Sequence, residues 1–383
     1  MSGNLTNSSD NRIDADLDPG RHIVIVPSDN ENQLSKKQYV DYHSYREQFL
    51  KWLLHIGKNP EKALGYSAYT VYESGYRAAA FDRWVWNTHD EYRIPPSHED
   101  ADGYLQEVAY SDRAQASKGK IEEMLKRYFR WLAHKYGKDE WEAQFSFQSS
   151  GDGQPRDFLT IDERRKIRQA SLEHGSIPTY NTLSPQKRSE WKGYVAQTLG
   201  KPVDKVTPED WNRVEGWKIT SMVWASLDAG LRPVEVQRAQ TTWVDIENGI
   251  LRIPKEESSK NRDNWRVSIT DRTAKSLERW MNERSNYDRY EDTETLWLTT
   301  HDNPYGSKSL GRLLRKLCKR AGIRTDNRQL SWYAIRHSVG TYMTHERDLA
   351  ATKAQLRHKS VKTTMKYDAV PVEDRREALD RMG

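Results

Sequence analysis

Residues 243–253 read WVDIENGILRI, and this stretch decides the class of fold because it interrupts a chain whose apolar spacing is otherwise helical. We expect a short strand over 243–247, a hairpin turn at Asn248-Gly249, the strongest two-residue signal for such a turn, and a returning strand over 250–253. A third strand is expected at 265–269. Together they predict a small antiparallel sheet in a mainly α-helical (α+β) fold.

Helix signals lie on both sides of this sheet. Capping boxes are expected to open helices after Ser35 and Thr160, and apolar residues follow Ser35 at helical spacing. Residues 149–155, SSGDGQP, have the composition of a linker. The expected divisions of the chain are a disordered segment over 1–34, a helical domain over 35–145, a linker over 146–158, a mixed domain over 159–367 and a tail over 368–383.

Composition excludes several classes of protein. The 383 residues include one cysteine, Cys318, which excludes an internal disulfide and a cysteine-based zinc site. No apolar run approaches the roughly 18 residues that a membrane span needs, and residues 1–20 lack the apolar core of a signal peptide. We therefore expect a soluble cytoplasmic protein with no membrane partner.

Charge is distributed unevenly along the chain. The net charge is only +5, but residues 301–383 hold 18 Lys+Arg against 9 Asp+Glu, and the first 300 residues hold 43 against 47. A basic C-terminal part is typical of a surface that binds a polyanion, and it is equally compatible with solvated helix faces.

Several residues with catalytic potential have ordinary interpretations when each is taken alone. Arg232 lies just past a predicted helix end, and Glu235 follows three residues later, which is typical of a structural ion pair. Arg336, His358 and Tyr367 are each compatible with a helix face or a packed ring. The acidic cluster beginning at His98 follows prolines, so we interpret it as a solvated turn rather than a metal site.

The order and spacing of the set are far more specific. The stretch GLRPVE at 230–235 resembles the first arginine box of the tyrosine recombinase (phage integrase) family, and Arg336-His337-Ser338 resembles the second. Leu356-Arg357-His358, with Tyr367 nine residues later, resembles the last box and the nucleophile. The resemblance covers about 155–383, and the preceding helical domain matches the family's core-binding, DNA-binding domain in position and character only.

This resemblance implies a site-specific DNA recombinase or integrase. Arg232 and Arg336 would clamp the phosphate, because guanidinium groups offer fixed bidentate donors to its oxygens. Tyr367 would attack and form a 3′-phosphotyrosyl link, although a tyrosine with an ordinary pKa of about 10 must be activated for this. A phosphodiester is exchanged for a phosphodiester, so neither ATP, a metal nor another cofactor is expected.

Supporting roles also follow from the resemblance. A lysine in the loop before the third strand would protonate the departing 5′-oxygen, and we favour Lys260 over Lys255 for this role. A lysine of this loop that does not transfer the proton, such as Lys255, would contact a DNA phosphate. His358 would hydrogen-bond the phosphate. Glu235 would hold the clamp in place, and His337 is a further supporting residue.

Two positions depart from the family pattern. Tyr333 stands where a histidine is usual, so the general base stays open between His358 and water. Arg357 stands where glycine is common. We expect it to add positive charge that contacts DNA, with only a local adjustment of the backbone.

The expected partner is double-stranded DNA, which the two domains would enclose as a C-shaped clamp. Strand exchange would occur in a homotetramer, and the free protein would be a monomer or dimer. The resemblance also allows for accessory DNA-bending proteins and implies a location at the nucleoid. The tail would pack on a neighbouring protomer or on its own domain. Exposed basic residues of one amphipathic helix are expected to meet backbone phosphates. They include Arg312, Arg315, Lys316 and Lys319.

Two alternatives come from other classes. A type IB topoisomerase would use the same transesterification, but the short spacing from His358 to Tyr367 favours the recombinase. A DNA-binding regulator that has lost catalysis is suggested by Tyr333.

Overall fold

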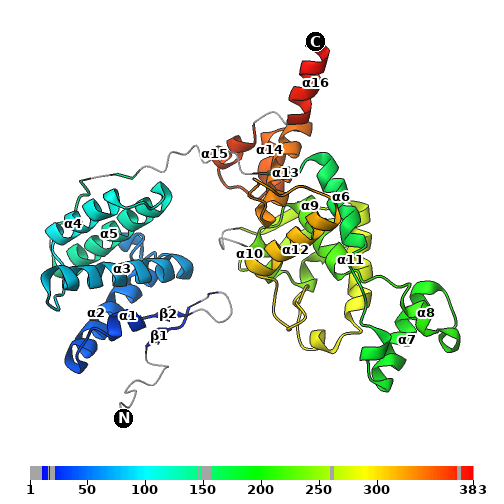
Figure 1. Ribbon diagram of the computed structural model, residues 1–383, viewed down its shortest axis with the longest axis horizontal. Coiled ribbons are helices and arrows are strands. Elements are labelled where there is room, and N and C mark those ends of the chain that lie inside the picture. The colour runs from blue at the N-terminus through cyan, green and yellow to red at the C-terminus, as the bar shows by residue number, and fades with distance from the viewer. Residues whose placement is uncertain are drawn as a thin grey trace. The chain divides into compact units, whose positions relative to one another are not determined.

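The computed structural model describes residues 11–15, 17, 22–137, 139–144, 146–147, 157–258, 263–368 and 372–382. The chain divides into two compact units, Met1–Gln154 and Pro155–Gly383. Both are mainly helical, and each contains one small antiparallel sheet, as Figure 1 shows. The predicted α+β class is confirmed. In the described part of the chain, no helix is long and apolar enough to span a membrane.

Four long helices build the N-terminal unit. Their bounds are Lys36–His55 (α2), Ala68–His89 (α3), His98–Tyr110 (α4) and Gln115–Tyr136 (α5). The predicted capping box at Ser35 is present, with Gln38 as its partner. The helices enclose a core rich in aromatic rings, in which Phe49, Phe81 and Tyr128 are fully buried. Helix α5 ends at Gly137 in the left-handed conformation that favours glycine.

The expected disorder of residues 1–34 is wrong for the described part of that segment. Strands Arg12–Ile13 (β1) and Ile23–Val24 (β2) pair antiparallel, and the short helix Ser28–Glu31 (α1) follows. Ile23, Ile25 and Val26 are buried in the core of the unit. The apolar run is short, but burial against the helices offsets the entropy of ordering it.

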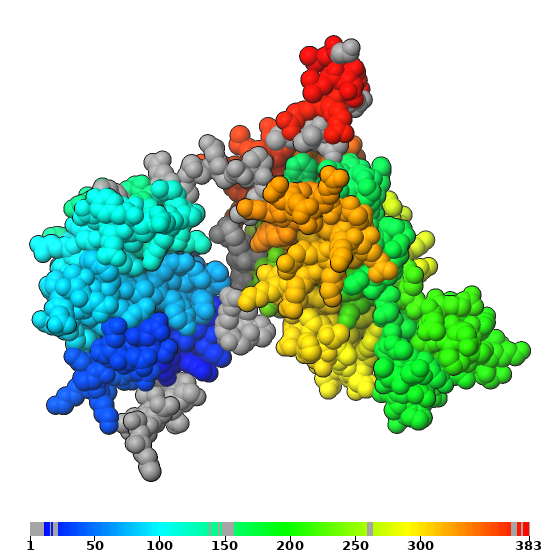
Figure 2. Space-filling view, in the orientation of Figure 1, coloured from blue at the N-terminus to red at the C-terminus, as the bar shows by residue number. Residues whose placement is uncertain are grey.

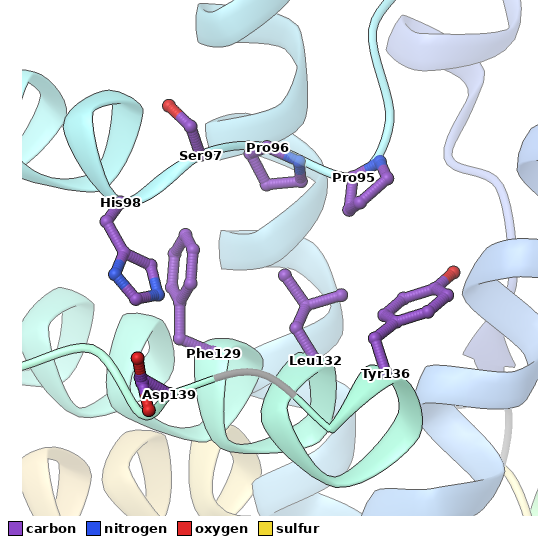
Figure 3. Close-up of a pocket in the computed structure, with 8 residues that line it drawn as sticks. All are labelled: Pro95, Pro96, Ser97, His98, Phe129, Leu132, Tyr136 and Asp139. Carbon is purple, nitrogen blue, oxygen red and sulfur yellow. The ribbon is translucent and has the colours of Figure 1, made fainter.

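The acidic cluster after Pro96 is also corrected, because it is the first turn of α4 rather than a turn in a loop. The Ser97 side chain accepts from the Asp100 backbone, and the Asp100 carboxylate accepts from the Ser97 backbone at 2.7 Å. His98 packs edge-on against Phe129, with ring centroids 5.2 Å apart. Figure 3 shows His98 and Phe129 side by side in a shallow pocket that the prolines close from above.

A buried polar network joins α2, α3 and α5. The Asp82 carboxylate accepts hydrogen bonds from the hydroxyls of Tyr42, at 2.6 Å, and Tyr128, at 2.8 Å. Arg46 lies 3.6 Å from the same carboxylate and donates to the carbonyl of Ile25, at 2.6 Å, and that of Gly75. Burial raises the pKa of Asp82, and Arg46 opposes that effect. This network fastens the N-terminal segment to the helices.

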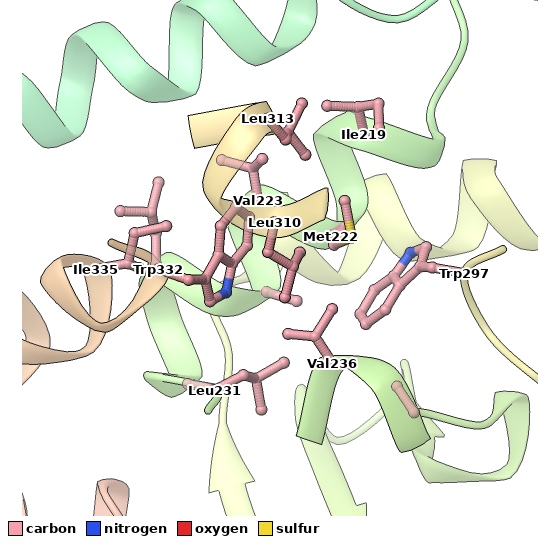
Figure 4. Packing of buried hydrophobic residues seen from close by; sticks show 14 of the residues in the cluster. Ile219, Met222, Val223, Leu231, Val236, Trp297, Leu310, Leu313, Trp332 and Ile335 are labelled. Atoms are coloured by element: carbon pink, nitrogen blue, oxygen red, sulfur yellow. The ribbon is translucent and has the colours of Figure 1, made fainter. Parts of the chain in front are cut away.

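The second unit packs five long helices around a small sheet. The helices are Ile161–Leu172 (α6), Lys218–Ala229 (α9), Asp271–Arg284 (α11), Ser307–Arg320 (α12) and Trp332–Glu346 (α13). The predicted capping box at Thr160 opens α6. Figure 4 shows the core between them, where Trp332 and Leu310 meet residues from α9 and the stretch after it.

The predicted sheet is present with shorter outer strands. Val244–Asp245 (β3), Ile250–Ile253 (β4) and Trp265–Ser268 (β5) pair antiparallel in the order β3-β4-β5. The register pairs Val244 with Leu251 and Leu251 with Val267, so one face of the sheet is buried. The loop between β4 and β5 lies partly outside the described residues.

Residues 176–215 form a lobe with its own small core. The side chains of Ser184 and Thr207 cap the helices Pro185–Leu199 (α7) and Pro208–Trp211 (α8). Trp191 and Trp211 are buried within the lobe. The lobe meets the rest of the unit through Tyr287, whose ring lies 4.7 Å from that of Trp191. In Figures 1 and 2 the green lobe projects from the body of this unit.

Short elements complete the second unit and carry most of the candidate site. They are Pro233–Arg238 (α10), Leu349–Gln355 (α14), Val361–Thr364 (α15), the 3-10 helix Met365–Tyr367 (η6) and Val372–Met382 (α16). The remaining 3-10 helices are Pro60–Lys62, Tyr180–Thr182, Val203–Lys205, Thr241–Trp243 and Asp288–Tyr290. The tail helix α16 leaves Leu379 and Met382 exposed, and its Asp374 lies 3.1 Å from His345 of α13.

We predict that Arg46→Met destabilises the N-terminal unit by about 3 kcal/mol, because it leaves the buried Asp82 carboxylate without its cation. Urea unfolding of the full chain measures this loss. The matched control is Lys51→Met, which breaks an exposed pair with Glu47 on the same helix and should cost less than about 0.5 kcal/mol. Equal, small losses in both variants would contradict the importance of the network.

Candidate active site

The first part of the site is the turn between α9 and α10. Gly230 ends α9 with φ +56°, and a Cβ there would also come within 2.6 Å of the Leu356 side chain. Arg232 follows as the residue that caps α10. Glu235 accepts from the Arg232 backbone at 2.7 Å and from its Nη1 at 2.8 Å. The stretch GLRPVE therefore folds so that its arginine and glutamate form an ion pair.

Arg336 joins three segments of the second unit. It lies on α13 with 2% exposure, and its Nη1 donates to the Gly230 carbonyl at 2.6 Å. Its Nη2 donates to the Leu356 carbonyl and lies 3.0 Å from Nε2 of His358. Burial and the positive charges of Arg357 and Arg232 lower its pKa to about 9. The guanidinium still carries its charge at neutral pH.

His358 is held by hydrogen bonds at both ring nitrogens. Because a guanidinium only donates, Nε2 accepts from Arg336, and Nδ1 therefore donates to the Thr364 hydroxyl at 3.0 Å. Burial, followed by the charges of Arg336 and Arg232, lowers the pKa of His358 to about 3. The ring is neutral at physiological pH.

Tyr367 lies in η6 between α13 and His358. Its hydroxyl is 3.0 Å from Nδ1 of His337, and its ring stacks parallel to that of His358 with centroids 5.9 Å apart. Only 4% of its surface is exposed. Gly340 on α13 makes room for it, because a Cβ there would lie 2.7 Å from the tyrosine ring. A glycine in mid-helix was the signal for this contact, and the sequence reasoning did not use it.

Arg357 does not contact solvent, so the expectation that its side chain reaches DNA is wrong. Its backbone adopts φ +58°, and its side chain is 0% exposed. Nη2 lies 2.7 Å and Nε 3.2 Å from the two Glu235 oxygens. The remaining donors reach the carbonyls of Ala229, Gly230 and Gln355 at 2.8 to 3.0 Å.

All five N–H groups of Arg357 therefore have an acceptor. The strained backbone costs of order 1–3 kcal/mol in general, and these buried charge-assisted hydrogen bonds offset it. The partners exist because the carboxylate of α10 and the last carbonyls of α9 converge beneath residue 357. The site thereby gains a second buried guanidinium beside that of Arg336, while Arg232 stays partly exposed.

Three arginines surround the single carboxylate of Glu235. Burial raises the pKa of Glu235, but Arg357, Arg232 and Arg336 outweigh it and lower the pKa to about 2. The side chain is 1% exposed. One negative and three positive charges leave the cluster with surplus positive charge, which suits an anion such as a phosphate group.

The other predicted site residues lie apart from this cluster or outside the described residues. Tyr333 is half-buried on α13, with its ring 6.3 Å from that of His337. Lys255 is exposed after β4, and its backbone donates to the Asn264 side chain. Lys260 lies outside the described residues. At the far side of the loop, Asp263 lies 3.9 Å from Lys359.

The basic helix α12 has the amphipathic character that its sequence predicts. Leu310, Leu314 and Leu317 are buried in the core of the unit. The predicted DNA-contacting residues Arg312, Arg315, Lys316 and Lys319 are all exposed. Among the residues that the structure describes, no group of three or more His, Cys, Asp or Glu is arranged to hold a metal ion.

Known proteins resemble this chain in sequence and fold. Residues 214–373 match the model of the phage integrase family, and the match begins at the end of the α7–α8 lobe. The tyrosine recombinase XerC of Syntrophus aciditrophicus (strain SB) is 24% identical over 230 residues, which cover 58% of this chain and 69% of XerC.

Two solved structures share the fold. The XerH site-specific recombinase, bound to palindromic difH substrate in a post-cleavage complex, has a TM-score of 0.57 and 14% identity, over 90% of this chain and 88% of XerH. A lambda integrase dimer bound to a COC′ core site has a TM-score of 0.51 and 14% identity, over 88% of this chain and 81% of that protein.

We predict that the ion-pair cluster makes stability depend on pH through Glu235. Its folded-state pKa of about 2 lies below its ordinary value of 4.5, so the stabilisation is complete above that value and is lost as the pH falls toward 2. Glu235→Gln should cost about 3 kcal/mol at pH 7, and the difference from wild type should shrink steadily below pH 4.5.

Urea unfolding at several pH values between 7 and 3 measures this difference. Glu278→Gln, a change at an exposed position of the same unit, is the matched control and should leave the pH dependence unchanged. A Glu235→Gln deficit that stayed constant over the whole range would show that the charge of this carboxylate is not what stabilises the cluster.

Proposed function

Because this chain is a tyrosine recombinase, a site-specific DNA recombinase of the phage integrase family, we propose that it cuts and rejoins duplex DNA through a covalent 3′-phosphotyrosyl intermediate. The observation that carries this proposal is the convergence of Arg232, Arg336 and His358 with Tyr367 in one buried, positively charged cluster. Each of these residues supplies a function that phosphoryl transfer requires.

The arginines act on the phosphate. Charge builds on the non-bridging oxygens in the transition state, and guanidinium groups already held in place stabilise it without reorganising. Glu235 and Arg357 position the pair rather than contact DNA. When DNA displaces the contact with Arg336, the ring proton of His358 moves from Nδ1 to Nε2, so that Nε2 donates to the phosphate and Nδ1 accepts from the Thr364 hydroxyl.

Tyr367 is the nucleophile. Its Oη attacks phosphorus, the bond from phosphorus to the 5′-oxygen breaks, and Lys260 or Lys255 gives a proton to that oxygen. The reverse reaction, with a 5′-hydroxyl from the partner duplex, reseals the strand. One phosphodiester replaces another, so the bond energy is retained and the reaction proceeds without ATP or a metal.

DNA is the proposed partner along a broad surface. The exposed arginines and lysines of α12 contact backbone phosphates, with an affinity that falls as salt rises. The XerH structure supports DNA as the partner, since it contains its difH substrate. We propose a homotetramer on two duplexes, in which the exposed apolar residues of α16 pack on a neighbouring protomer, and action at the nucleoid.

Covalent trapping tests the proposed function. On a nicked suicide duplex taken from DNA that flanks the chain's own gene, the wild-type protein should form an adduct that survives detergent, because the broken strand cannot be religated. Peptide mapping should place the DNA on Tyr367, and Tyr367→Phe should abolish the adduct.

A wild-type chain that binds this duplex specifically and forms no adduct would favour the regulator without catalysis. Relaxation of supercoiled plasmid by monomers without recombinant products would instead favour a topoisomerase. Recombinant products that depend on two copies of the site are the outcome that the proposal requires.

We also predict that Tyr333→Phe slows cleavage by less than about 100-fold relative to wild type. This is a much smaller loss than the one expected for Tyr367→Phe. In the described part of the chain no hydrogen bond joins Tyr333 to the nucleophile, and its phenol is a weak base near neutral pH. Single-turnover cleavage rates on the suicide duplex provide the comparison. Complete loss of cleavage in both variants would show that Tyr333 is essential.

A further inference from the structure

The proposed reaction needs a group that takes the proton from the Tyr367 hydroxyl. Tyr333, which stands at the position expected for this group, lies beyond His337 with ring centroids 6.3 Å apart. His358 stacks on the Tyr367 ring, but its Nε2 lone pair accepts from Arg336 and its Nδ1 donates to Thr364. Neither nitrogen of His358 is directed at the phenol oxygen.

His337 has the geometry that the other two residues lack. Its Nδ1 lies 3.0 Å from Oη of Tyr367, within the range in which a proton is transferred directly. The side chain is 7% exposed, so the contact is sheltered from bulk water. It stands on α13 next to Arg336, whose three contacts fix that turn of the helix.

Two further features favour proton transfer at this contact. Gly340, one turn along α13, lets the Tyr367 ring approach the helix closely enough for the hydroxyl to reach His337. Lys366 places its ammonium 5.0 Å from the centre of the tyrosine ring, and Arg336 interacts electrostatically with Tyr367. These two positive charges stabilise the phenolate character that develops during attack.

We propose that His337 is the general base of this recombinase, an inference that rests on the proposed function. Nδ1 accepts the phenolic proton while Oη forms its bond to phosphorus and the bond to the 5′-oxygen breaks. The protonated imidazole then keeps that proton through the covalent intermediate. When a 5′-hydroxyl attacks the phosphotyrosine, the imidazolium returns the proton to the departing Tyr367 oxygen.

Removal of the base tests this role. His337→Asn should lower the single-turnover rate of adduct formation on the nicked duplex by about 10²- to 10⁴-fold, the usual contribution of general acid–base catalysis. Affinity for the same duplex should stay within a few-fold of wild type, which shows that the variant is folded. The matched control is His301→Asn, which changes an exposed histidine of the same unit and should not alter the rate.

A second variant separates proton transfer from positioning. A tyrosine that carries several ring fluorines, incorporated at position 367, ionises close to neutral pH, so its attack depends far less on a base. We compare two proteins that both carry this fluorotyrosine, one with His337 and one with His337→Asn. Their cleavage rates should differ by no more than about 10-fold, because most of the rate lost with the base is recovered.

The outcomes are distinct. Slow cleavage that fluorotyrosine rescues supports His337 as the base. Slow cleavage without rescue overturns it in favour of a residue that only orients the nucleophile, and an unchanged rate in His337→Asn overturns it outright. If the wild-type protein forms no adduct at all, the proposed function fails and this inference fails with it.

Discussion

The architecture of the site depends on one buried carboxylate. Glu235 pairs with Arg232, three residues before it, and with Arg357, 122 residues after it, and it also interacts electrostatically with Arg336. Without a negative charge among them, three guanidinium groups, two of them buried, could not lie so close together. With it, two of them are fixed before any ligand arrives, so their positions need not be established during the reaction.

The same constraint explains the local backbone. The carbonyl of Gly230, where α9 ends, accepts from Arg336 and from Arg357, so the two arginines share one acceptor. Arg357 adopts a left-handed backbone conformation, with φ +58°, directly before His358. Arg336, Arg357 and His358 are therefore linked through the end of a single helix, α9.

Local features were predictable from the sequence, whereas distant partners were not. The helix caps at Ser35 and Thr160 and the hairpin at Asn248-Gly249 involve residues within a few positions of one another, and all are present. The burial of Arg357 could not be foreseen, because its carboxylate partner is 122 residues away. The reach of His337 to Tyr367 spans 30 residues and depends on the path of α13 and η6. Proton roles at Lys255 and Lys260 stay predictions.

The errors had different physical origins. The helix at Ser97 carries its own capping signal, which the neighbouring prolines obscured. The N-terminal segment has little apolar content, and its order comes from a network in α2 and α3 that composition does not reveal.

That packing bears on how the protein can be shortened. A version trimmed at residue 34, the natural choice for a tail assumed to be loose, would remove the buried Ile23, Ile25 and Val26. The vacated groove between helices would meet water, and an apolar surface of that kind promotes self-association. Poor solubility of such a fragment would reflect a missing piece of core rather than a defect in the second unit.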